Sequence, residues 1–111
     1  MTEKTRYQDI PCYTTRDGSQ IRELMHPAVH GNANQSLAEA TLEAGQQTRL
    51  HRHQNSEELY HITAGHGLMQ LGSSRFEIGT GDTVAIPPGT PHAVENTGDR
   101  PLVILCCCSP P

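Results

Sequence analysis

Short stretches of alternating apolar and polar residues, separated by glycine and proline, run along most of the chain. Alternation with a period of two is typical of β-strands that bury one face. No segment sustains the 3.6-residue apolar pattern of an amphipathic helix for ten residues. The pattern predicts strands at Gln20–Met25, Ser36–Leu42, Leu59–Thr63, Gly67–Leu71, Arg75–Ile78, Thr83–Ile86, His92–Glu95 and Leu102–Cys108.

Turn signals separate these segments at short intervals. The residues Gly72-Ser73-Ser74 lie between two apolar runs and are typical of a β-hairpin loop. The stretches "TGDT", "PPGTP" and "TGDRP" indicate further turns. Residues 21–25 also fit a helical spacing, but Pro27 follows them, so we favour a strand there. Short strands at close spacing predict an all-β sandwich or barrel.

Length and charge limit the classes of function. The 111 residues leave room for one domain with a modest core, so we expect a single domain over residues 1–111. The net charge of −4 and the absence of a cluster among the eight Lys and Arg argue against nucleic acid and anionic membranes as partners. The polar N-terminus lacks the apolar core of a secretory signal, and no run of 18 apolar residues occurs. We therefore expect a soluble cytoplasmic protein.

Three adjacent cysteines, Cys106, Cys107 and Cys108, lie at the end of the last expected strand. A disulfide framework would use spaced cysteines, so we expect free thiols in a reducing compartment. On a strand, Cys106 and Cys108 share one face and Cys107 takes the other. Two interpretations stay open, in which the thiols are small buried apolar groups or line a pocket.

Three histidines and a glutamate are candidates for a metal site. His51 and His53 are separated by one residue, so on an extended strand both imidazoles point to one side and can converge on one ion. Glu58 follows five residues later, and His92 stands at a turn that leads into another strand. Imidazole and carboxylate together are donors that suit a divalent transition metal. Each residue alone is weak evidence, but the combination predicts a metal centre.

The spacing of ten residues resembles the two sequence motifs of the cupin superfamily. The first motif consists of Gly45, His51-x-His53, Glu58 and Gly65, and the second of Gly81, Pro87-x-Gly89, His92 and Asn96. The resemblance implies an all-β double-stranded β-helix, the jelly-roll barrel, with a cavity at one end. It places N-terminal strands at about 1–43, the metal-binding motifs at 45–65 and 81–96, and a C-terminal strand at about 102–108.

The same resemblance implies one divalent transition metal per chain, which is Fe, Mn, Ni, Cu or Zn. Its ligands would be His51, His53, Glu58 and His92. Glu58 is chosen over Glu57 because only Glu58 keeps six residues before the glycine that ends the first motif. Gly65, Gly81 and Gly89 are then turn residues, and Asn96 is expected to bond to the backbone near the Pro87 turn that leads into His92.

Strand alternation separates the side chains around Glu58. If Glu58 faces the interior, Tyr60 shares its face and His61 points outward. Tyr60 is therefore a candidate for orienting a bound ligand or relaying a proton, and Glu58 is also a candidate acid or base.

Three imidazoles and one carboxylate leave positions open on an octahedral metal ion. Open positions favour a metal-dependent oxidoreductase of dioxygenase type that acts on a small organic acid, phenol or diketone. An isomerase or lyase of the sugar-isomerase-like kind and a non-catalytic binding or sensing module are the alternatives. The partners that we expect are a small molecule and a second copy of the chain, since short barrels of this family commonly pair through an outer sheet.

Overall fold

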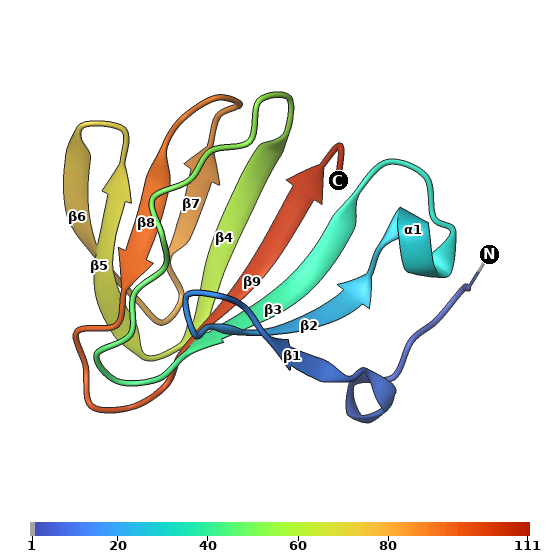
Figure 1. Ribbon diagram of the computed structural model, residues 1–111, viewed down its shortest axis with the longest axis horizontal. Helices are drawn as coiled ribbons and strands as arrows, with labels where there is room; N and C mark the ends of the chain where they lie inside the picture. Colours follow the sequence, from blue (N-terminus) through green and yellow to red (C-terminus); the bar gives the residue numbers. More distant parts are fainter. Residues whose placement is uncertain (1) are drawn as a thin grey trace.

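Two antiparallel β-sheets make up most of the molecule (Figure 1). The computed structural model describes residues 2–111. The larger sheet has the order β1 (Cys12–Thr14), β2 (Gln20–Met25), β3 (Ser36–Leu42), β9 (Leu102–Ser109), β4 (Glu57–Ala64) and β7 (Thr83–Ile86). The smaller sheet has the order β6 (Ser74–Gly79), β5 (His66–Leu71) and β8 (His92–Glu95). Within residues 2–111, no helix combines the length and the apolar character that a membrane crossing needs.

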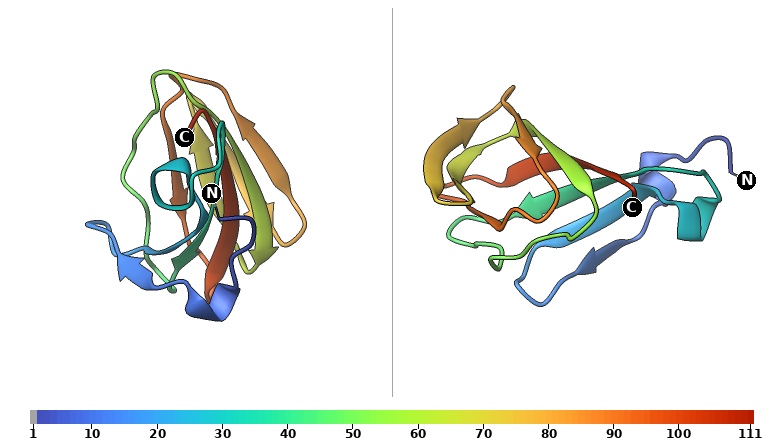
Figure 2. Two further views of the ribbon diagram at one scale, coloured as in Figure 1. Left: turned by 90° about the vertical axis from the view of Figure 1, so that its right-hand side faces the viewer. Right: turned by 90° about the horizontal axis from the view of Figure 1, so that it is seen from above.

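The two sheets enclose a common interior, and the larger sheet extends past the smaller one toward the N-terminal strands (Figures 1 and 2). Apolar side chains from both sheets fill the closed end of this interior; they include Leu42, Ile62, Met69, Val94, Leu102 and Ile104. Burial of each such side chain contributes about 1.5–3 kcal/mol. The fold is a jelly-roll barrel, the predicted class.

The burial of β4 alternates as predicted. Glu58, Tyr60 and Ile62 are buried, whereas Leu59 and His61 are exposed. Because β4 lies between β9 and β7, the same face of all three strands meets the interior. The alternation therefore brings the functional candidates Glu58 and Tyr60 to the inner face of the larger sheet.

All eight predicted strands are present, and four have the predicted limits. The sequence missed β1, whose three residues are all exposed and show no alternation. It also missed the short helices η1 (Tyr7–Asp9) and α1 (Pro27–His30). Pro27 does end the preceding strand, but it also begins α1, where a missing N–H does no harm. The predicted hairpin loop is shorter than expected, because Ser74 already belongs to β6.

Gly65 shows why a glycine ends the first motif. Its φ of 81° lies in the left-handed region, at the turn between β4 and β5. A Cβ atom at this position would lie 2.5 Å from the Pro101 carbonyl oxygen. The close approach of two backbone segments therefore excludes a side chain here.

Candidate metal centre

Two isolated bridges hold the irregular segment before β4 against β8. Gln47 pairs with Glu95, and His51 pairs with His92. The His51 N–H donates to the His92 carbonyl at 3.1 Å, and the His92 N–H donates to the His51 carbonyl at 2.8 Å. The two histidines therefore lie side by side although forty residues separate them in the sequence.

Three imidazoles converge at this place. The ring centroids of His51 and His92 are 4.3 Å apart, those of His51 and His53 are 5.4 Å apart, and those of His53 and His92 are 5.8 Å apart. One ring nitrogen from each residue lies within 4.8 Å of the others. His92 is fully buried, whereas His51 is exposed. This geometry can hold one metal ion at the rim of the interior.

Backbone carbonyls fix the orientation of two of the rings. Nδ1 of His51 lies 2.8 Å from the Arg49 carbonyl oxygen, and Nδ1 of His92 lies 3.0 Å from the Thr90 carbonyl oxygen. A carbonyl oxygen only accepts, so each Nδ1 carries the proton and donates it. The Nε2 lone pair of each ring is then free for a metal, as is usual for histidine ligands.

Glu58 supplies a carboxylate next to the histidines. Its Oε1 atom lies 3.5 Å from Nε2 of His53 and 3.5 Å from Nε2 of His92, which is too long for an ordinary hydrogen bond. Glu58 Oε1 and His92 Nε2 are both buried and have no hydrogen-bond partner. Buried polar atoms normally have partners, so a cation between these atoms fits the donor set.

Electrostatics around His92 act in two directions. Burial lowers the pKa of His92, whereas the Glu58 carboxylate and the Thr90 carbonyl raise it, and the net pKa is above its ordinary value. The site therefore attracts positive charge, whether a proton or a metal ion supplies it.

His51, His53 and Glu58 line a cavity of about 360 Å³ on the inner face of the larger sheet, and His92 is not among its lining residues. Tyr60 also lines it, with its ring 5.8 Å from the His92 ring in an edge-on arrangement. Burial raises the pKa of Tyr60 well above its usual value, and the neighbouring Cys106 and Glu58 raise it further. The phenol therefore stays protonated and can donate a hydrogen bond within the cavity.

Two of the adjacent cysteines face the same cavity. Cys106 and Cys108 line it, opposite Tyr60 and Glu58 in the pairing of β9 with β4. Cys107 points to the other side of the sheet, as the alternation predicts. All described cysteines are free thiols, and burial raises the pKa of the Cys106 thiol strongly. The structure thus favours the pocket-lining interpretation for Cys106 and Cys108.

Two other histidines and an aspartate lie outside the cluster of three histidines. His61 is exposed on the outer face of β4, where Nδ1 lies 2.7 Å from the Thr83 hydroxyl. His26 caps α1 by accepting the Ala28 N–H at 3.0 Å, and it also lines the cavity. Asp17, in the loop between β1 and β2, is a cavity residue that sequence reasoning missed. The dipeptide Asp17-Gly18 signals a turn, but nothing local indicates where that turn lies in the fold.

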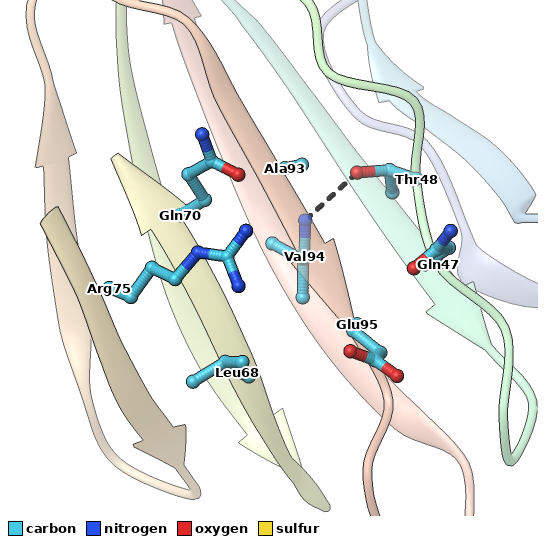
Figure 3. Close-up of a pocket in the computed structure, with 8 residues that line it drawn as sticks. All are labelled: Gln47, Thr48, Leu68, Gln70, Arg75, Ala93, Val94 and Glu95. Carbon is cyan, nitrogen blue, oxygen red and sulfur yellow. Dashed lines mark hydrogen bonds between the residues drawn. The ribbon is translucent and has the colours of Figure 1, made fainter. Parts of the chain in front are cut away.

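A second, smaller cavity of about 140 Å³ lies on the other side of β8 (Figure 3). Gln70 and Arg75 face Gln47 across the strand, and the Thr48 hydroxyl accepts the Val94 N–H at 2.9 Å. Strand alternation directs the neighbouring His92 side chain away from this groove. The groove is therefore separate from the histidine cluster.

Facing antiparallel sheets with three histidines at the rim of their interior define a jelly-roll barrel that can hold a metal. Residues 38–108 match the family model of the cupin domain, and the chain belongs to the cupin family. The chain is 54% identical over 108 residues to an uncharacterized protein of Methanocaldococcus jannaschii, which covers 97% of this chain and 86% of that protein.

Two further relatives come from Thermotoga maritima. An oxalate-binding protein is 32% identical over 94 residues, which cover 81% of this chain and 77% of that protein. The crystal structure of a predicted oxalate decarboxylase has a TM-score of 0.80 at 24% identity and covers 96% of this chain and 97% of that one. At this identity the structural match supports the fold alone.

Proposed function

We propose that the protein binds one divalent transition metal through four side chains and uses it to act on a small organic ligand in the cavity. The proposed metal ligands are His51, His53, Glu58 and His92. The observation that carries the proposal is the unpartnered burial of Glu58 Oε1 and His92 Nε2 beside two further imidazoles. Each buried polar group without a partner costs about 1–3 kcal/mol, and a bound cation would remove that cost.

The donor set limits the metal. Three imidazole nitrogens and one carboxylate oxygen suit Fe(II), Mn(II), Ni(II), Cu(II) or Zn(II), and for a functional role we favour iron or manganese. Such an ion supplies Lewis acidity or one-electron chemistry at the coordination positions that the protein leaves open. The cavity side of the site is the side on which a ligand can reach those positions.

Metal-dependent oxidation is the reaction that we favour, with a small organic acid, phenol or diketone as substrate. A cavity of about 360 Å³ has the size of a small organic ligand. Tyr60, held protonated, would donate a hydrogen bond to the ligand and orient it, and Glu58 is the nearest carboxylate for a proton transfer. Ligand binding without turnover is the second candidate, favoured by the 32% identity to an oxalate-binding protein.

The proposal is tested on protein that has been stripped of metal and loaded anaerobically with Fe(II) or Mn(II). Oxygen uptake is then measured with a panel of small acids, phenols and diketones, and binding is measured by calorimetry. Oxygen consumption with one compound supports the oxidoreductase, and binding without turnover supports the second candidate. Turnover that needs no oxygen would replace both with an isomerase or lyase.

Two histidine variants test the ligand set itself. His92→Ala should lower the metal content of purified protein at least tenfold, because it removes a buried donor. His61→Ala is the matched control, since its ring lies outside on β4 and bonds to Thr83. Loss of metal from the His61 variant instead would refute the proposed ligand set.

We also propose that two copies pair through the outer face of the larger sheet. Leu37, Cys107 and Leu59 lie opposite one another in register across β3, β9 and β4. The two leucines are 38% and 43% exposed, so the row is an apolar strip on the surface. Light scattering should give the mass of a dimer, and Leu59→Glu should give a monomer. A monomeric wild-type protein at micromolar concentration would contradict the pairing.

A further inference from the structure

The charged side chains of the cavity wall all have the same sign. Asp17, Glu23 and Glu58 line it, and they come from the β1–β2 loop, from β2 and from β4. Across residues 2–111, no lysine or arginine lines this cavity. His26 also lines the cavity, and its Nδ1 accepts the Ala28 N–H at 3.0 Å.

Hydrogen bonds keep Asp17 ionised. Burial raises the pKa of Asp17, but hydrogen bonds from Thr15, Ser19 and the Arg49 amide outweigh this effect, and the pKa falls to about 2. The bonds from the Ser19 hydroxyl and from the Arg49 N–H are 2.7 Å and 3.2 Å long. A carboxylate with several donors cannot easily swing away, so this charge stays at the cavity.

The pairing of β2 with β3 determines the position of Glu23. Glu23 lies opposite Ala38 in this pairing, and both residues line the cavity. The register of this pairing shifts between Glu23 and Met25, near the end of β2. Arg22, the neighbour of Glu23, bonds to the Ile10 carbonyl at 2.6 Å and does not neutralise the cavity.

When a metal is bound, the charges around the cavity oppose the binding of a ligand with two negative charges. A divalent metal brings two positive charges and the three carboxylates bring three negative ones, so the loaded cavity carries a net charge of about −1. A dicarboxylate gains from the metal but is repelled by Asp17 and Glu23, which do not bind the metal. A chelating ligand with one negative charge meets about half of this repulsion, and its two oxygens can still occupy both open positions on the metal.

We propose that the cavity selects chelating ligands with at most one negative charge, such as hydroxamates, hydroxyketones and diketones, over dicarboxylates such as oxalate, and that Glu23 is a specificity-determining residue. This inference rests on the proposed metal site and names the ligand class of that site. It predicts a preference different from the one that the similarity to an oxalate-binding protein would indicate.

The experiment uses full-length protein loaded with Mn(II) and two probes of similar size that chelate through two oxygens, oxalate and acetohydroxamate. Calorimetry gives the affinity of each probe for the wild type and for Glu23→Gln. The substitution should strengthen oxalate binding about three- to tenfold and change acetohydroxamate binding less than about twofold. Glu39→Gln is the matched control, because Glu39 lies on the outer face of the same sheet, where its carboxylate accepts the Tyr7 hydroxyl.

A second measurement needs no variant. Raising the salt concentration screens the repulsion, so oxalate binding to the wild type should strengthen and acetohydroxamate binding should change little. Unchanged oxalate affinity in Glu23→Gln, or oxalate binding that weakens with salt, would overturn the selectivity while the metal site stands. Wild-type protein that retains no metal after loading would refute the proposed function and this inference with it.

Discussion

Asp17 connects the β1–β2 loop to the segment that carries His51. Its Oδ1 atom accepts the Ser19 N–H at 3.1 Å, the Ser19 hydroxyl at 2.7 Å and the Thr15 hydroxyl. Its Oδ2 atom accepts the Arg49 N–H at 3.2 Å, and the Arg49 carbonyl in turn accepts from Nδ1 of His51. Asp17→Ala should therefore lower both the stability of the fold and the affinity for metal.

The size of the effect follows from these contacts. Four hydrogen bonds at about 0.5–1.5 kcal/mol each set an upper range, and water replaces part of them because Asp17 is only half-buried. We expect a loss of about 2 kcal/mol, which lowers the Tm of a chain of this length by about 10 °C. Metal affinity should fall about three- to tenfold, since Arg49 no longer has a fixed position from which to orient His51.

Thermal unfolding of the metal-free protein measures the first effect, and a competition titration with a chromophoric chelator measures the second. Asp99→Ala serves as the control, because Asp99 is an exposed carboxylate in a surface bend. Wild-type Tm and wild-type metal affinity in the Asp17 variant would refute the proposed connection. A lower Tm with unchanged metal affinity would limit the role of Asp17 to stability.

The contribution of Asp17 to the stability of the fold should also depend on pH. The pKa of Asp17 falls from its ordinary 3.8 to about 2 in the folded protein, so the unfolded chain binds the proton more tightly. The stability that the carboxylate contributes is therefore present above about pH 4 and is lost as the pH falls through about 2. After a discount for partial exposure it amounts to about 1 kcal/mol, and the gap between wild type and Asp17→Asn should close over this range.

Three other substitutions test the metal site and the packing of the barrel around it. Glu58→Gln should lower metal affinity at least tenfold in a competition titration. The metal-free Tm should hold or rise, because the substitution removes a buried carboxylate whose Oε1 atom has no hydrogen-bond partner; a lower metal-free Tm would contradict this. Gly67→Ala would place a Cβ atom 2.3 Å from the Glu95 carbonyl oxygen and should cost about 3 kcal/mol in urea unfolding, whereas Gly79→Ala, with 3.9 Å to its nearest neighbour, should cost less than about 1 kcal/mol. Asn96→Ala removes three backbone hydrogen bonds of 2.8–2.9 Å from a buried side chain, and a loss below about 1 kcal/mol in the same assay would contradict that role.

The strands of the barrel could be predicted because each one buries a single face. A strand whose inner residues are apolar cannot shift by one position without exposing them, so the alternation in β4 also determined which candidates face inward. The prediction that Glu58 and Tyr60 face inward and His61 faces outward needed no knowledge of the partner strands. Asn96 was expected to bond near the turn before His92, but it lies at the other end of β8, where its side chain donates to the Leu42 and Arg100 carbonyls and accepts the Gly98 N–H.

The contacts that complete the site could not be predicted, because they join segments that are far apart in the sequence. The pairing of His51 with His92 and the bond from the Arg49 amide to Asp17 depend on the approach of loops that have no periodic pattern. We expected His51 and His53 to lie on an extended strand. The structure has no strand there, and His51 forms only an isolated bridge. The local sequence predicts a strand well, but it contains little information about where an irregular segment lies in the fold.

Contacts with neighbouring segments therefore determine the position of the segment that carries His51 and His53. On one side β8 holds it through two bridges, and on the other side the loop after β1 holds it through Asp17. Glu58, on β4 of the larger sheet, faces His92, on β8 of the smaller sheet, so the four candidate ligands come together only when both sheets are in place. Because the unfolded chain has no such site, a bound metal would stabilise the packing of the two sheets, and that packing would in turn stabilise the metal at the open end of the barrel.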